Sequence, residues 1–326
     1  MELLAVNNNL VDEVVVEERI TSSGSFIEAN TIAMTAEEMK YRHIIPVFVK
    51  DNETTISHTE FIETTCNVTR DYFHGARLLH PDLRVSHPIK GRIPEARNKA
   101  AKELLEHEKT LYYERMAFMI ELPDISREVN GNKLSLVVGG VKAYSEDNLY
   151  NKKGAAEHFK IFVGFQNKVC LNLCLWTDGL KADIRVTNLT DLTRSIYELL
   201  SNFHAEKQLE MLQEFAMLVI TEHQFAQLIG RAKLYQFLQP EEKKLIPSFL
   251  FGDYHINTIA KDYYNSKSFS RDKNGNINLW NLYNLFTGSN KSSYIDKYLE
   301  RGLNATQFTA SLTNAIKNQE DFWFIN

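Results

Sequence analysis

The sequence predicts an α+β protein in which a mixed, mainly antiparallel sheet domain is followed by a helical C-terminal region. Apolar, strand-like runs dominate the chain between about residues 112 and 186. After Asn188 the apolar residues recur at helical spacing instead. The pair Asn130-Gly131 between two of the runs is typical of a tight antiparallel hairpin. We therefore expect an N-terminal tail or loosely packed strand at 1–34, a sheet domain at 35–187 and a helical region at 188–326.

Capping and turn signals predict the first elements of the sheet domain. Thr35 to Glu38 and Ser57 to Glu60 match the capping-box pattern, so one helix begins near residue 36 and another near residue 58. Gly75 suits the end of the second helix. Pro46 predicts an edge strand over 44–49, because proline cannot donate to a ladder. Pro94 suits the first position of a helix running to about residue 107.

The remaining elements follow from periodicity. Strands are expected at 112–122, 133–144, 159–165, 168–176 and 182–186. Helices are expected at 189–203, 209–218, from 221 to just before Pro240, at 279–286 and at 305–317. The strand runs are mostly apolar with imperfect alternation, which indicates a sheet that is covered on both faces.

Composition limits the class of protein. With 326 residues and 44% hydrophobic content, the chain can bury a large core. Its net charge is −5, so attraction to nucleic acid must come from local clusters. No apolar run approaches the ~20 residues of a membrane span, and the acidic start is unlike a secretory signal. Three cysteines do not make a disulfide framework, so we expect a cytoplasmic protein without a membrane partner.

The strongest charge cluster lies between residues 84 and 102. Its basic residues are Arg84, Lys90, Arg92, Arg97, Lys99 and Lys102, against the single acid Glu95, a net charge of +5. A turn-rich loop with two of these cations leads into the expected helix, whose first N–H groups also attract anions. This arrangement predicts a phosphate-binding surface. The alternative is a solvated basic helix face neutralised by the glutamates at 103, 106 and 108.

A second positive set surrounds the loop after residue 144. It consists of Lys142, Lys152, Lys153 and Lys160, with Tyr144 and Tyr150 between them. Lysines that contact phosphates and aromatic rings that stack on bases are typical of single-strand-binding grooves. Asp147 and Glu157 dilute this positive field, and tyrosines near strand ends are also common at the edge of a core. Both interpretations stay open from the sequence.

No motif indicates catalysis, a metal site or a cofactor. Cys170 and Cys174 are four residues apart, a spacing that does not match a zinc knuckle, so we expect small buried side chains. A metal-dependent nuclease would need acids such as Asp147, Glu157 and Asp178 to converge. We therefore expect no catalytic residues, no metal and no cofactor, and an enzyme is the less favoured interpretation.

Several longer blocks together resemble a known family. These are VSHPIKGRIPEAR, KTLYYERMAF, VGGVKAYSEDNLYNKKG, FKIFVGFQNKVCLNLCLWTDG and LWNLYNLFTGSNKSSYIDKYL. They resemble domain-of-unknown-function family 3871, which is found in bacteria and often carried on conjugative and phage-like elements. More distantly, the layout is similar to the phage/plasmid-like family of unknown function. Neither family has assigned catalytic residues, so the resemblance implies only a mobile-element context.

Three functions follow as hypotheses. The leading one is a non-enzymatic DNA-binding accessory factor of a mobile element that handles single strands, with the two positive sets contacting phosphate. The second is a protein-interaction module, such as an inhibitor of a host defence factor, whose helical half binds a host or element-encoded protein. The acidic net charge and the aromatic end, Phe322-Trp323-Phe324, favour the second. The third is a metal-dependent nuclease. The sequence does not set an oligomeric state.

Overall fold

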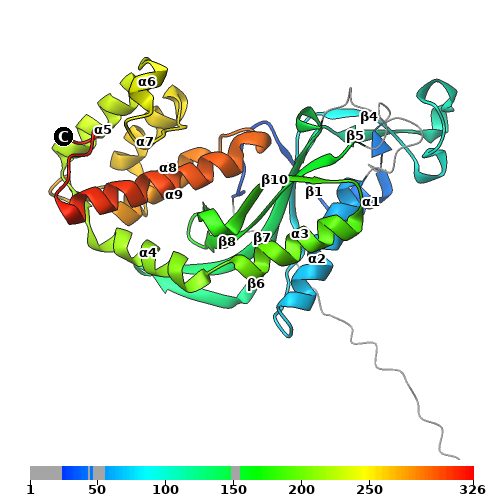
Figure 1. Cartoon of the computed structure of the whole chain (residues 1–326), viewed down its shortest axis with the longest axis horizontal. Coiled ribbons are helices and arrows are strands. Elements are labelled where there is room, and N and C mark those ends of the chain that lie inside the picture. The colour runs from blue at the N-terminus through cyan, green and yellow to red at the C-terminus, as the bar shows by residue number, and fades with distance from the viewer. Residues whose placement is uncertain (1–23, 43–44, 47–55, 148–154) are drawn as a thin grey trace, which may run out of the picture.

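The computed structural model describes residues 24–42, 45–46, 56–147 and 155–326. Figure 1 shows two parts, a strongly curved sheet and a helical region, with helix α9 running from one toward the other. The α+β class and the switch from strands to helices near residue 188 are therefore confirmed.

The main sheet has seven strands. They are β1 (Ile32–Met34), β3 (Asp82–Val85), β6 (Arg115–Val129), β7 (Asn132–Ala143), β8 (Glu157–Asn167), β9 (Leu173–Cys174) and β10 (Leu180–Val186). Their order is β1-β3-β6-β7-β8-β10, with β9 also pairing with β8, and every pairing of the described strands is antiparallel. The turn between β6 and β7 has positive φ at both Asn130 (49°) and Gly131 (75°), which confirms the predicted hairpin.

A second sheet has three strands, which are interspersed along the chain with the first strands of the main sheet. It consists of β2 (Ile45–Pro46), β4 (Pro88–Arg92) and β5 (Lys109–Tyr113), in the order β2-β4-β5. β2 is an edge strand, as Pro46 predicted, although most of the expected run 44–49 lies outside the described residues. The single strand expected at 112–122 is divided between the two sheets. β5 of the small sheet ends at residue 113, and β6 of the large sheet begins at residue 115.

The prediction of a helix that begins at Pro94 is wrong. Three short 3₁₀ turns, η1 (Pro94–Ala96), η2 (Ala101–Glu103) and η3 (Glu106–Glu108), take its place. The buried guanidinium of Arg92 donates to the backbone carbonyls of Arg97 (3.3 Å) and Lys99. These carbonyls would otherwise accept the next bonds of an α-helix, so a tertiary contact replaces the helical pattern.

Nine helices are present in the described ranges. They are α1 (Ala36–Arg42), α2 (His58–Tyr72), α3 (Leu189–Asn202), α4 (Ala205–Met217), α5 (Glu222–Tyr235), α6 (Pro240–Lys243), α7 (Asp253–Asn265), α8 (Leu279–Asn290) and α9 (Ile295–Asn318). The capping boxes of α2 at Ser57 and α5 at Thr221 are present. A short pair, β11 (Val219–Ile220) and β12 (Ile277–Asn278), links α4 and α8.

The core lies on both faces of the main sheet. Alternate residues of a strand point to opposite faces. Leu136 and Val138 of β7 belong to a large core that includes residues of α2 and α3. Val137 and Val141 of the same strand pack instead with the first residues of α9. The nearly continuous apolar runs therefore reflect coverage of both faces.

The aromatic C-terminus belongs to this core. Phe322 and Phe324 are buried, and the Phe324 ring lies 4.8 Å from Phe308 of α9 and 5.5 Å from Phe249, measured between ring centroids. Phe322 and Phe324 are therefore core residues that are not exposed for docking, whereas Trp323 is half-buried at the edge of the core. Among the helices of the described ranges, none combines the length and apolar character needed to cross a membrane.

Candidate functional site

The first predicted phosphate cluster is only partly on the surface. Lys90 is exposed on β4, whereas Arg92, two residues further along the strand, is buried. Arg84 of β3 donates from Nε to Thr31 Oγ1 (3.1 Å) and from NH2 to the Thr31 carbonyl (2.9 Å). The Lys99 ammonium pairs with the buried carboxylate of Glu108, and that hydrogen bond holds the pKa of Glu108 below its ordinary value. Arg97 is half-buried.

Lys142 of the second cluster lies inside the protein. Its ammonium is fully buried, 2.7 Å from Glu157 Oε2 and 3.3 Å from Asp147 Oδ2, and lies 4.0 Å from the centroid of the Phe159 ring. Burial raises the pKa of Glu157 above its ordinary value, although the attraction of Lys142 partly offsets this. The other Glu157 oxygen accepts the Ile56 N–H (2.7 Å), so the cluster also fixes the start of α2.

Tyr144, expected to stack on a base, is also buried. Its hydroxyl donates to the Tyr112 hydroxyl (3.0 Å), and the Tyr112 ring stacks on His58 at 4.3 Å between centroids. Desolvation raises the pKa of both tyrosines well above their ordinary value. This aromatic stack fills the interior of the protein and offers no platform to a base.

Lys160 points to the opposite face of the sheet from Lys142. It is paired across β7 and β8 with Val141, so it shares the α9 face. Its ammonium contacts Glu146 (2.6 Å), Glu300 (2.9 Å) and the Asp296 carbonyl (2.8 Å). Desolvation lowers its pKa, but the hydrogen bonds to the two glutamates outweigh this and raise it overall. The expected common groove containing Lys142 and Lys160 is therefore not formed.

Of the remaining predicted residues, those that the structure describes form ion pairs. Lys152, Lys153 and Tyr150 lie outside the described residues. Asp147 and Glu157 converge on Lys142, while Asp178 accepts from His204 (3.0 Å). Within the described ranges, no group of three or more His, Cys, Asp or Glu side chains could hold a metal ion. Burial raises the pKa of Cys66 and Cys170 to about 11 and of Cys174 to about 12, so these thiols are poor nucleophiles.

The structure draws attention to a different surface, in the helical region. Five large apolar side chains between residues 234 and 254 are exposed, which we call the α5–α7 surface: Leu234, Phe237, Leu245, Leu250 and Tyr254. Leu245 is 86% exposed, Phe237 74% and Tyr254 68%. Isolated exposed apolar residues are ordinary, but a concentration of this kind marks binding surfaces.

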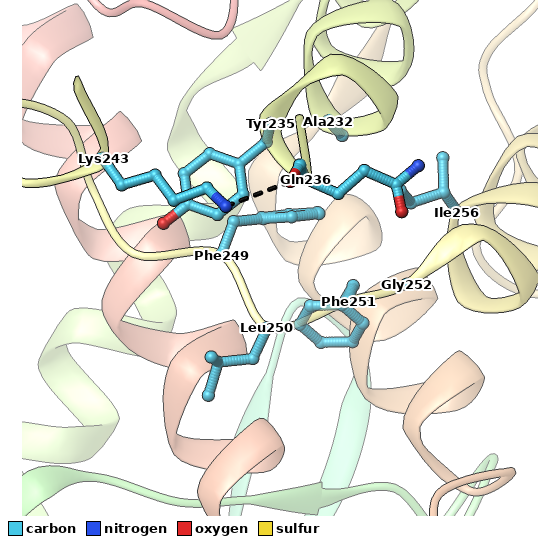
Figure 2. A pocket seen from close by; sticks show the side chains of 9 residues that line it. All are labelled: Ala232, Tyr235, Gln236, Lys243, Phe249, Leu250, Phe251, Gly252 and Ile256. Atoms are coloured by element: carbon cyan, nitrogen blue, oxygen red, sulfur yellow. Dashed lines mark hydrogen bonds between the residues drawn. The ribbon is translucent and has the colours of Figure 1, made fainter. Parts of the chain in front are cut away.

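One of these residues, Leu250, lines a pocket of about 250 Å³ (Figure 2). It is lined by Ala232, Tyr235 and Gln236 of α5, Lys243 of α6, residues 249–252, and Ile256 of α7. The Tyr235, Phe249 and Phe251 rings give it an aromatic wall, with centroid separations of 6.0 Å and 5.5 Å between successive rings. The Lys243 ammonium lies 5.4 Å from the centroid of the Tyr235 ring and donates to the Gln236 carbonyl (3.1 Å).

Helix α9 fixes the segment that forms one side of the pocket. Asn304 accepts the Leu250 N–H (2.9 Å) and donates to the Ser248 carbonyl (2.9 Å), while Arg301 Nε donates to the Leu250 carbonyl (2.9 Å). Phe249 and Phe251 are buried between exposed Ser248, Leu250 and Gly252. The outward position of Leu250 is therefore imposed by the fold.

The sequence contained a weak signal for this surface. The buried positions of α5 are Phe225, Leu228 and Ala232, and Leu234 does not follow their helical spacing. An apolar residue out of phase with the buried face of its helix is a candidate for contact with another molecule. The nearby Leu245 and Leu250 have no such periodic signal, because they lie between helices.

The chain was compared with known proteins. A family model described as "Domain of unknown function, B. Theta Gene description (DUF3871)" matches residues 4–325. No curated protein and no solved structure matches the chain.

Proposed function

We propose that this chain, which belongs to the DUF3871 family, is a non-enzymatic protein-interaction module that binds another protein through its α5–α7 surface. The observation that carries this proposal is the exposure of five large apolar side chains within residues 234–254, the segment that also supplies most of the lining of the aromatic pocket. Apolar side chains of this size are the usual anchors of protein interfaces, and burying them removes unfavourable contact with water.

The fixed position of Leu250 within the surface supports the same function. The side chains of Asn304 and Arg301 hold the segment that carries Leu250, and the Phe249 ring packs on Phe308 of α9 at 5.1 Å. A preformed surface loses little conformational entropy on binding, which favours affinity. The carboxylates considered for a nuclease support that function less well, because they form ion pairs with Lys142 or His204.

The proposal is tested by capture with matched variants. The full-length chain, its Phe237→Asp/Leu245→Asp variant and a Leu105→Asp control would be incubated with host lysate and the retained proteins quantified. Leu105 is an exposed leucine near the small sheet, so its substitution controls for a surface charge change. We expect a discrete set of proteins to be retained by the chain and the control and lost with the double variant. Equal retention by all three would overturn the proposal.

We also propose a mobile-element context, in which the bound protein is encoded by the host or by the element. The resemblance to a family often carried on conjugative and phage-like elements supports this context. Genes of family members should then lie beside conjugation or phage genes more often than randomly chosen genes of the same genomes do. A neighbourhood count with no enrichment would remove this part of the proposal.

A second candidate function is DNA binding by the surface of the small sheet. Lys90 on β4 and Lys102 in η2 are both exposed, which favours contact with phosphates. Fluorescence anisotropy with labelled single- and double-stranded DNA at low salt would test it. We expect Lys90→Glu/Lys102→Glu to weaken binding and Lys207→Glu, an exposed lysine of α4, to leave it unchanged. Absence of binding by the parent chain would exclude this function.

A further inference from the structure

Residues 248–252, of which residues 249–252 line the pocket, have the character of a β-strand edge. Exposed and buried residues alternate along this segment, as in an extended chain. In such a chain, the N–H and C=O groups of one residue point to one side and those of the next residue to the other. The Leu250 N–H and C=O and the Ser248 C=O all bond to α9, so that side is occupied.

The opposite side carries backbone groups without partners. Within the described ranges, no hydrogen bond is made by the backbone N–H or C=O of Phe249 or Phe251. Both residues are at least nine-tenths buried and line the pocket. Buried backbone groups are paired in the great majority of cases, so unpaired groups at two alternate positions that line a pocket indicate a missing partner. An extended peptide backbone supplies alternating donors and acceptors at the required spacing.

The pocket adds a requirement on the side chains of that partner. Its aromatic wall and its volume of about 250 Å³ fit one large apolar side chain. At the same pocket, the Lys243 ammonium donates to the Gln236 carbonyl (3.1 Å). An ammonium carries three donors, so this contact leaves further capacity for an anion. Charge complementarity therefore favours a carboxylate next to the apolar anchor.

We propose that the α5–α7 surface binds an extended segment of another protein, which pairs with residues 248–252 and carries a large apolar anchor beside an acidic residue. The inference rests on the proposed function and specifies the chemistry of the partner. A partner helix has its own backbone bonds satisfied internally, so it would leave Phe249 and Phe251 unpaired. Strand addition satisfies them and places the anchor in the pocket.

The test uses a displayed library of short random peptides selected against the full-length chain. We expect enrichment of peptides with an aromatic or large aliphatic residue adjacent to Asp or Glu. Fluorescence anisotropy with an enriched peptide should show affinity on the order of ten-fold weaker for Lys243→Glu, because a favourable charge contact becomes repulsive. Lys233→Glu, at an exposed lysine of α5 outside the pocket lining, is the matched control.

Backbone pairing is tested on the peptide, where folding of the protein is not at issue. Single N-methylation at successive positions removes one donor at a time. Strand addition predicts a two-residue alternation, with methylation at every second position weakening binding on the order of ten-fold. Uniform effects along the peptide, or no enriched peptide, would overturn the inference. If the double variant at Phe237 and Leu245 still abolishes capture from lysate in that case, the proposed function stands and only the extended partner is excluded.

Discussion

At the scale of the residue, Lys142 supplies the clearest prediction about stability. Its ammonium is buried between Glu157 and Asp147, and removing it would leave two carboxylates without their cation. Breaking a buried pair by deleting one partner costs about 3–5 kcal/mol. We expect Lys142→Met to lower the free energy of unfolding by about that amount at neutral pH, as measured by urea denaturation.

The pH dependence of this loss has a defined sign. Burial raises the pKa of Glu157, so the folded chain holds that proton at higher pH than the unfolded chain does. The difference between variant and parent should therefore be greatest at neutral pH and shrink as the pH falls toward 4.5, the ordinary glutamate value. Lys90→Met, at an exposed lysine, is the control and should change stability by less than about 0.5 kcal/mol. Equal effects of the two substitutions would contradict the buried position of Lys142.

The direction of individual side chains could not be predicted from the sequence. The positive charges near residues 84–102 and 142–160 are visible in the sequence, but the direction of each side chain depends on strand register. Lys142 and Lys160 lie on neighbouring strands and point to opposite faces, which no local pattern reveals. The exposed Leu245 and Leu250 are equally hidden, since only the tertiary bonds of Asn304 and Arg301 fix residues 248–250.

At the scale of the element, β7 leaves no space for a side chain at Gly139. A Cβ atom there would lie 2.1 Å from the Phe118 carbonyl oxygen and 2.6 Å from Cζ of Phe162. Overpacking of this kind costs about 1–3 kcal/mol or more, because β6 and β8 must move apart. We expect Gly139→Ala to lower the free energy of unfolding by at least that amount in urea denaturation.

Gly230 of α5 is the matched control for this substitution. A Cβ atom there meets nothing within 4 Å, and the residue is exposed within a helix. Alanine loses less conformational entropy than glycine on folding, so Gly230→Ala should stabilise the chain by about 0.5–1 kcal/mol. Replacing glycine by alanine should therefore lower the free energy of unfolding in β7 and raise it in α5. A loss at Gly230 comparable to that at Gly139 would show that the space around β7 is not the cause.

Elements were predictable where their signals are local. The capping box at Ser57 and the Asn130-Gly131 hairpin depend on neighbouring residues and are found as expected. The absence of a helix after Pro94 could not be predicted from local signals. It depends on the Arg92 guanidinium, which lies on β4 and donates to the backbone carbonyls of Arg97 and Lys99. Helix α7 was missed because its N-cap, Gly252, provides no side-chain signal.

At the scale of the whole molecule, buried polar contacts join the sheet to the helices. Asn284 of α8 accepts from the side chains of Asn167 (3.1 Å) and Asn172 (3.3 Å), which lie at the end of β8 and in the following turn. Trp280 Nε1 donates to Asn132 Oδ1 of β7 (2.8 Å), and Lys160 binds Glu300 of α9. No pattern in the sequence indicates these contacts, although the α+β class and the helical C-terminal region were predicted correctly.

These contacts predict that sheet and helices unfold together. Asn284→Ala would remove the acceptor of the buried Asn167 amide, while the Asn172 amide keeps its bond to the Asn284 carbonyl (3.0 Å), and an unsatisfied buried group costs about 1–3 kcal/mol. If the contacts couple the parts, amide exchange should accelerate by a similar factor in β8 and in α5, which is remote from the substitution in the chain. Asn318→Ala, at an exposed position near the end of α9, should change neither. Acceleration in β8 alone would instead show that the helical region, and with it the α5–α7 surface, keeps its structure independently of the sheet.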